Sequence, residues 1–104
     1  MNAIGIPKNP ELAVRSWEQA CLNGWPRGCV DLGEAYLIGR VIEKRPELAV
    51  KYFGLACKSG HLSVCTRLGL IYRHGQGVEK DETRALTLLK AACENGWQPA
   101  CNNL

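Results

Sequence analysis

Three nine-residue stretches, each with a cysteine at both ends, decide the fold of this 104-residue chain. They read CLNGWPRGC (Cys21–Cys29), CKSGHLSVC (Cys57–Cys65) and CENGWQPAC (Cys93–Cys101). Consecutive copies begin 36 residues apart, and no gap is needed to superimpose them. A fixed period of this length is the sequence signature of a repeat architecture, in which each copy is one supersecondary unit.

The match extends beyond the cysteines to small and apolar residues. The positions that coincide in all three copies are Ala13, Ala49 and Ala85; Ala20, Ala56 and Ala92; Gly24, Gly60 and Gly96; and Leu32, Leu68 and Leu104. Gly33, Tyr36 and Gly39 recur as Gly69, Tyr72 and Gly75. We therefore predict a single repeat domain over residues 1–104, with repeat windows 5–40, 41–76 and 77–104.

Each copy contains an apolar stripe with the spacing of one helix face. In the middle copy the stripe is Leu48, Ala49, Tyr52, Phe53, Ala56 and Cys57, and its copies are Leu12, Ala13, Trp17, Ala20, Cys21 and Ala85, Leu86, Leu89, Ala92, Cys93. Asn9 and Asp81 are good N-caps, and Pro10 and Pro46 suit a first helical turn. We expect these stripes to face the core.

A second helix follows each stripe after a turn whose glycine favours the left-handed conformation. It carries Leu32, Gly33 and Tyr36, repeated as Leu68, Gly69 and Tyr72. Glycine inside a helix costs about 1 kcal/mol relative to alanine, so its repetition predicts a close approach of two helices. The fold class is therefore all-α: an α-solenoid of antiparallel helix-turn-helix repeats, with two full hairpins and a half-repeat at each end.

These motifs resemble a known repeat family. The pattern Leu-Gly-x-x-Tyr-x-x-Gly (32–39 and 68–75), the loop Gly-x-Gly-Val-x-Lys-Asp (75–81) and the later Ala-Cys pairs are similar to Sel1-like repeats, which are relatives of tetratricopeptide repeats. The paired cysteines resemble the cysteine-rich members of that family. Half-units at both ends are typical of a small member or of a piece of a longer array. The first loop departs from the pattern, because Val41 stands where Gly77 does.

The six cysteines are predicted to form three local disulfides. The turn between each pair folds the next helix back, so Cys21–Cys29, Cys57–Cys65 and Cys93–Cys101 come within bridging reach. Reduced core thiols and metal or heme ligation stay as alternatives, although seven intervening residues suit zinc poorly. Disulfides imply an oxidising compartment, periplasmic or secreted, with the mitochondrial intermembrane space as the alternative. Residues 1–10 do not read as a signal peptide.

Composition and charge narrow the classes of partner. The chain is 46% hydrophobic and 22% charged, with a net charge of +3, and acids and bases are interleaved. An interleaved surface does not favour nucleic-acid binding, which uses a concentrated basic face. The longest apolar runs are only a few residues, so membrane insertion is not expected. No cofactor or metal is assigned.

Catalytic motifs are weak in this sequence. His61 and His74 are the only histidines, and neither has a nucleophile at a recognisable spacing. Some cysteine-rich relatives are described as β-lactamases or penicillin binders, so a β-lactam or cell-wall-fragment binder, or a weak β-lactamase, is the alternative function. Lys58-Ser59-Gly60 resembles one motif of those enzymes but is better explained as a turn. We expect no enzyme and no catalytic residue.

The favoured function is a protein- or peptide-binding adaptor. By resemblance to tetratricopeptide arrays, the first helix of each hairpin lines a concave face. The residues expected to bind a partner there are Arg27, Val30, Glu34, Leu37, Ile38, Ser63, Thr66, Leu70, Arg73 and His74. Packing against the next hairpin is the alternative role for the apolar ones. Trp25, His61 and Trp97 occupy one repeat position and either cover the disulfides or form an aromatic row for a partner.

Overall fold

The computed structural model describes residues 9–40 and 42–104, and within these ranges the chain forms six α-helices. They are α1 (Pro10–Leu22), α2 (Pro26–Ile38), α3 (Pro46–Lys58), α4 (Leu62–His74), α5 (Glu82–Glu94) and α6 (Gln98–Asn102). The prediction of an all-α solenoid of helix-turn-helix repeats is confirmed. Val41, the start of the window 5–40 and residues 1–8 lie outside the described residues.

The helices begin where the capping residues predict. The Asn9 side chain accepts a hydrogen bond from the Leu12 amide at 3.1 Å, and Asp81 accepts one from the Arg84 amide at 3.0 Å. Proline stands in the first turn of α1, α2 and α3, where its missing N–H leaves no intrahelical bond unmade. The side-chain caps fix the starts of α1 and α5, whereas α3 begins after Arg45 without a side-chain cap.

The short turns are three copies of one structure. Gly24, Gly60 and Gly96 have φ values of 89°, 95° and 95°, which is the left-handed region. After each glycine, an amide hydrogen bonds back to the carbonyl five residues earlier, as in a Schellman motif. The three bonds run from Trp25 to Ala20, from His61 to Ala56 and from Trp97 to Ala92. The turn reverses the chain at the same place in every repeat.

Each turn is bridged by a disulfide, in the predicted pairing. Cys21–Cys29, Cys57–Cys65 and Cys93–Cys101 have Cα–Cα separations of 4.6, 4.8 and 4.7 Å.

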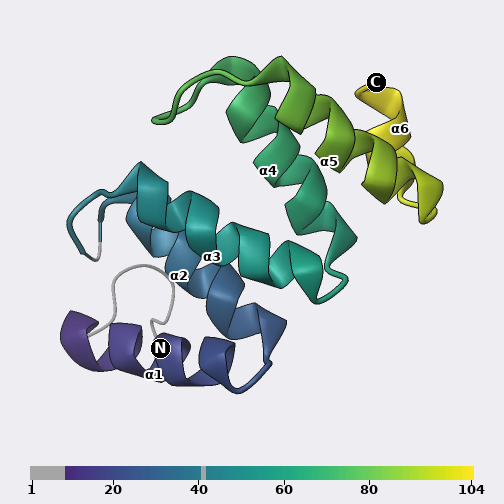
Figure 1. Ribbon diagram of the computed structural model, residues 1–104. Helices are drawn as coiled ribbons and strands as arrows, with labels where there is room; N and C mark the ends of the chain where they lie inside the picture. Colours follow the sequence, from purple (N-terminus) through teal and green to yellow (C-terminus); the bar gives the residue numbers. More distant parts are fainter. Residues whose placement is uncertain (1–8, 41) are drawn as a thin grey trace.

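Figure 1 shows the helices stacked in sequence order, with α3 in front of α2 and α5 in front of α4. The described chain measures 40 × 25 × 24 Å, as expected for a short solenoid.

The core lies between the paired helices α2 and α3 and between α4 and α5. A Cβ atom on Gly33 would lie 2.6 Å from the Phe53 ring, and one on Gly69 would lie 3.0 Å from Leu89 Cγ. Phe53 and Leu89 are fully buried and stand at equivalent positions of consecutive repeats. The close approach predicted from the repeated glycines therefore exists, mainly between each glycine and a large side chain.

Two residues of the predicted core stripes are not in the core. Leu12 is 59% exposed and Leu86 is 42% exposed. Each helix of a solenoid is covered only by its neighbours. Among residues 9–40 and 42–104 no helix precedes α1, and α5 is followed only by the five-residue α6. The stripe prediction was wrong at these two positions because it assumed equal cover for every repeat.

Candidate functional site

The predicted partner-binding residues divide into buried and exposed groups. Val30, Leu37 and Thr66 are 4%, 8% and 7% exposed, so their assignment to an open binding face was wrong. Val30 and Leu37 belong to the same buried cluster as Leu32. The reason is that α2 and α4 contact helices on more than one side, so each helix buries more than one apolar stripe.

Two polar members of the set, Glu34 and Arg73, are engaged within the chain. Glu34 is half-exposed and accepts a 2.8 Å hydrogen bond from Arg67, whose guanidinium lies 5.0 Å from the centre of the Phe53 ring. Arg73 donates a 2.8 Å hydrogen bond to the Asn103 carbonyl. These contacts join α2 to α4 and α4 to the segment after α6, so both residues have a structural role.

The remaining members do not gather into one site. Arg27, Ile38, Ser63 and His74 are exposed, and Leu70 is partly buried. None of the ten predicted residues lines the hollows that lie between α3 and α5. Their role in binding stays a prediction.

The surface is instead hollowed between α3 and α5, with α4 as the floor. One hollow of about 490 Å³ occupies the middle of this face. It is lined by Val50, Lys51, Gly54, Leu55, Lys58, Leu68, Tyr72, Arg84, Thr87 and Leu88. Apolar side chains from all three helices meet there, and charged side chains stand at its edges.

Two further hollows continue the middle one in opposite directions. Toward the 75–81 loop, a hollow of about 600 Å³ is lined by Glu47, Val50, Tyr72, Val78, Glu79, Lys80, Asp81 and Arg84. Toward the second disulfide, one of about 440 Å³ is lined by Cys57, Lys58, Gly60, Leu62, Cys65, Ala91, Ala92 and Asn95. The middle hollow shares Val50, Tyr72 and Arg84 with the hollow at the 75–81 loop, and it shares Lys58 with the hollow near the second disulfide. We call these three adjoining hollows together the α3/α5 groove.

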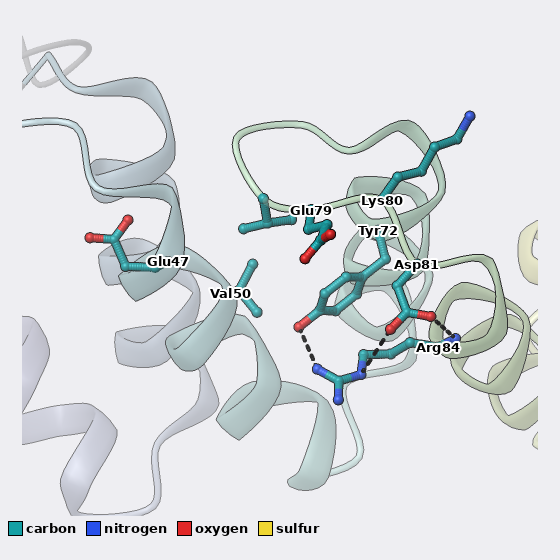
Figure 2. Close-up of a pocket in the computed structure, with 8 residues that line it drawn as sticks. Glu47, Val50, Tyr72, Glu79, Lys80, Asp81 and Arg84 are labelled. Carbon is teal, nitrogen blue, oxygen red and sulfur yellow. Dashed lines mark hydrogen bonds and ion pairs between the residues drawn. The ribbon is translucent and has the colours of Figure 1, made fainter.

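An interaction between α4 and α5 orders the end of this groove that lies at the 75–81 loop. Figure 2 shows Arg84 reaching the Tyr72 hydroxyl, which accepts a 3.1 Å hydrogen bond, while Asp81 lies 3.9 Å from Arg84 Nε. The guanidinium also lies 5.1 Å from the centre of the Tyr72 ring. The hydrogen bond with Tyr72 raises the pKa of Arg84 above its usual value. Arg84 is therefore a fixed positive charge on the groove.

Charge is distributed unevenly along the groove. The middle hollow is lined by three cations, Lys51, Lys58 and Arg84, and by no carboxylate. The hollow at the 75–81 loop adds three carboxylates, Glu47, Glu79 and Asp81, together with Lys80, and Figure 2 shows Glu47 and Glu79 on its two sides. The groove therefore has a basic middle and a more acidic end.

Sequence reasoning missed the groove, although one residue signals it. Gly54 lies inside α3 and lines the middle hollow, while Glu18 and Lys90 stand at the equivalent positions of the other copies. A Cβ atom on Gly54 would meet nothing within 4 Å. A glycine in one copy only, inside a predicted helix, could have been found from the sequence as a position without a scaffold role.

The aromatic position after each turn does not form a uniform row. Trp25 is 67% exposed, whereas His61 and Trp97 are partly buried. Trp97 packs against the cluster that contains Cys65 and Leu89. A covering role therefore fits Trp97, and an exposed aromatic surface is confined to Trp25.

The motif weighed for β-lactam chemistry has a local structural role. Ser59 is the C-cap of α3, and its hydroxyl donates a 3.2 Å hydrogen bond to the Leu55 carbonyl. Across residues 9–40 and 42–104, no three His, Cys, Asp or Glu side chains gather in a way that could hold a metal ion. In the same residues, no helix is both long enough and apolar enough to cross a membrane.

Comparison with known proteins places the chain in a family. The model of the Sel1 repeat matches residues 1–25, 26–61 and 63–97. No curated protein sequence matches the chain significantly.

Among solved structures, Helicobacter pylori cysteine rich protein B is 30% identical, with a TM-score of 0.82 over 92% of this chain and 72% of that one. A protective antigen of uropathogenic Escherichia coli that displays an SLR fold is 32% identical, with a TM-score of 0.81 over 99% of this chain. A Sel1 repeat protein from Oxalobacter formigenes is 29% identical, with a TM-score of 0.78 over 86% of this chain. This chain covers only 22% and 26% of those last two proteins. Because the repeat matches span nearly the whole sequence, the chain belongs to the Sel1 repeat family.

Proposed function

We propose that this chain is a protein- or peptide-binding repeat module that holds a segment of its partner in the α3/α5 groove. The observation that carries the proposal is the groove itself, three adjoining hollows with an apolar floor and charged side chains around them. Apolar anchors surrounded by polar groups are the composition of protein interfaces. Membership of the Sel1 repeat family supports the proposal, because repeat solenoids bind partners through extended surfaces.

The scaffold around the groove is suited to binding without rearrangement. The Cys57–Cys65 disulfide ties the end of α3 to the start of α4, and both cysteines line the lower hollow. A groove with one wall covalently tied to its floor loses less conformational freedom when a segment binds. The proposal assigns binding alone to this site, with no catalytic residue.

The cellular location belongs to the same proposal. Three disulfides persist where the environment is oxidising. We place the module in the periplasm or the secreted space, where its partner would also be found.

Blocking the groove tests this function. A random-peptide library displayed on phage is selected on the wild-type chain, and the affinity of the selected peptides is measured by fluorescence anisotropy. Gly54→Trp fills the middle hollow with a neutral side chain, while Gly54→Ala makes the same backbone change and leaves the hollow open. We expect Gly54→Trp to weaken binding at least tenfold and Gly54→Ala to change it less than twofold.

Two results would contradict the proposal. One is a library that yields no binder to the wild-type chain. The other is a set of peptides that bind Gly54→Trp as tightly as wild type, which would move the site away from the groove. Circular dichroism of both variants shows whether the helical fold is retained.

A further inference from the structure

We infer that the segment held in the α3/α5 groove is an acidic peptide with apolar anchor residues, and that its carboxylates lie beside Lys51 and Lys58. This inference rests on the proposed function and adds the chemistry of the partner. The occupant is a protein segment and not a nucleic acid, because the groove floor is apolar.

The cations that line the middle hollow favour an acidic segment. Lys51 and Lys58 are exposed, and neither makes an ion pair with any described residue. Lys51 Nζ lies 5.4 Å from the Tyr52 ring centre, a contact that leaves its charge available. Arg84 is shared with Asp81 at 3.9 Å but still faces the same hollow. Three cations around a hollow without a lining carboxylate favour an anionic occupant, since complementary potentials select and orient partners.

The apolar floor of the groove disfavours a ligand that binds through its charge alone. Leu68 and Tyr72 of α4 lie beneath the middle hollow, and Val50, Leu55 and Leu88 line its sides. Leu55 is 37% exposed. A bound segment would bury this surface with leucine-like or aromatic side chains, which a nucleic-acid backbone does not offer.

Gly54 marks the place where the bound segment approaches the α3 backbone most closely. The other glycines within the helices are packed: a Cβ on Gly28, Gly33 or Gly69 would lie between 2.6 and 3.0 Å from a neighbouring atom. At Gly54 the same atom would meet open space, so nothing in the described chain requires a glycine there. A glycine lets another chain approach the helix backbone. The long side chains of Glu18 and Lys90 at the equivalent positions would obstruct that approach.

The unequal charge also orients the segment. Glu47 and Glu79 line only the end of the groove at the 75–81 loop, whereas Lys58 lines both the middle and the lower hollow. Acidic residues of the segment therefore lie toward the Cys57–Cys65 disulfide. At the 75–81 loop three carboxylates outnumber Lys80 and Arg84, so that end of the segment is neutral or basic.

The test uses charge reversal on the peptides selected above. Lys51→Glu/Lys58→Glu inverts the two cations of the middle hollow that make no ion pair with a described residue. Arg15→Glu/Lys90→Glu is the matched control, because both of its residues are exposed on helices, lie outside the groove and change the net charge equally. We expect the selected peptides to be rich in Asp and Glu and to carry apolar residues. Their affinity is expected to fall at least tenfold for the groove variant, less than threefold for the control, and steeply with salt.

The outcomes separate this inference from the proposed function. Peptides that are blocked by Gly54→Trp but are neutral or basic would overturn the inference and leave the function standing. Peptides that ignore Gly54→Trp would overturn both. A single-stranded DNA oligonucleotide that competes as well as the selected peptides do would also overturn the inference, because the groove would then read charge alone.

Discussion

Among single residues, glycines inside the helices differ sharply in what surrounds them. Gly33 faces the Phe53 ring, where a Cβ atom would lie only 2.6 Å away, while Gly54 faces the open groove. The first glycine is required by packing inside the chain. The second weakens its helix without any compensating contact in the described residues, and this imbalance connects a stability measurement to the binding proposal.

We predict that Gly54→Ala raises the free energy of unfolding by about 1 kcal/mol, because alanine is the better helix former and its methyl group meets no obstacle. Gly33→Ala is expected to lower it by about 1–3 kcal/mol, because the ring must shift. Urea unfolding midpoints at unchanged slope measure both effects. A Gly54→Ala variant less stable than wild type would show that the position is already filled.

Asp31 in α2 gives a prediction about pH. Burial raises the pKa of this carboxyl above 3.8, Arg27 at 3.4 Å opposes the shift, and Glu34 adds to it. The folded chain therefore holds the proton more tightly than the unfolded chain. The stability that this group contributes is complete below pH 3.8 and is lost as the pH rises through the higher folded value.

Asp31→Asn removes that loss. We expect the variant to be more stable than wild type at pH 7, by well under 1 kcal/mol because partial exposure screens the charge. The advantage should shrink as the pH falls toward 3. Chemical unfolding at several pH values checks this, and a difference that stays constant with pH would contradict it. The lost contact with Arg27 matters little, since that side chain is 77% exposed.

Among the helices, α6 depends most on contacts with the rest of the chain. It has only five residues, and a helix so short is not stable alone. Cys93–Cys101 ties it to α5, Arg73 holds the Asn103 carbonyl at 2.8 Å, and Ala100 is fully buried. The disulfide is the strongest of these ties because it is covalent.

We predict that Cys93→Ser/Cys101→Ser releases α6 and leaves the other helices folded. Hydrogen exchange of the Ala100 amide should become at least tenfold faster, while the Leu68 amide in α4 keeps its protection. Cys21→Ser/Cys29→Ser is the control, because it removes an equivalent bridge at the opposite end. Unchanged exchange at Ala100 would mean that burial alone holds the helix.

The local structure could be predicted from the sequence, because it is decided by neighbours in the chain. The caps at Asn9 and Asp81, the left-handed turn glycines and the cysteine pairing all depend on residues within about eight positions. Which surface is open to a partner could not be predicted. Whether Val30 or Leu37 is buried depends on how one hairpin lies against the next, and a repeat period of 36 residues does not contain that geometry.

At the scale of the whole molecule, the solenoid has a small core for its length. Helices contact mainly their neighbours in sequence, so no central core ties the two ends together. Few fully buried side chains are large, the main ones being Phe53, Leu32, Ile71 and Leu89. The alanines that recur in every repeat bring the helices close but bury little surface each. Covalent bridges are therefore expected to carry an unusual share of the stability.

Reduction of the three disulfides tests that expectation. In the chain-entropy view, a disulfide that closes a loop this short contributes about 2.5 kcal/mol to the free energy of unfolding. Three such bridges together amount to a large part of the usual free energy of unfolding of about 5–15 kcal/mol. We predict that full reduction lowers the free energy of unfolding by several kcal/mol and the melting temperature by well over 10 °C. Peptide mapping without reductant, which should find the three local bridges and no free thiol, establishes the starting state. A melting temperature unchanged by reductant would show that the repeated alanine and glycine contacts hold the solenoid without the bridges.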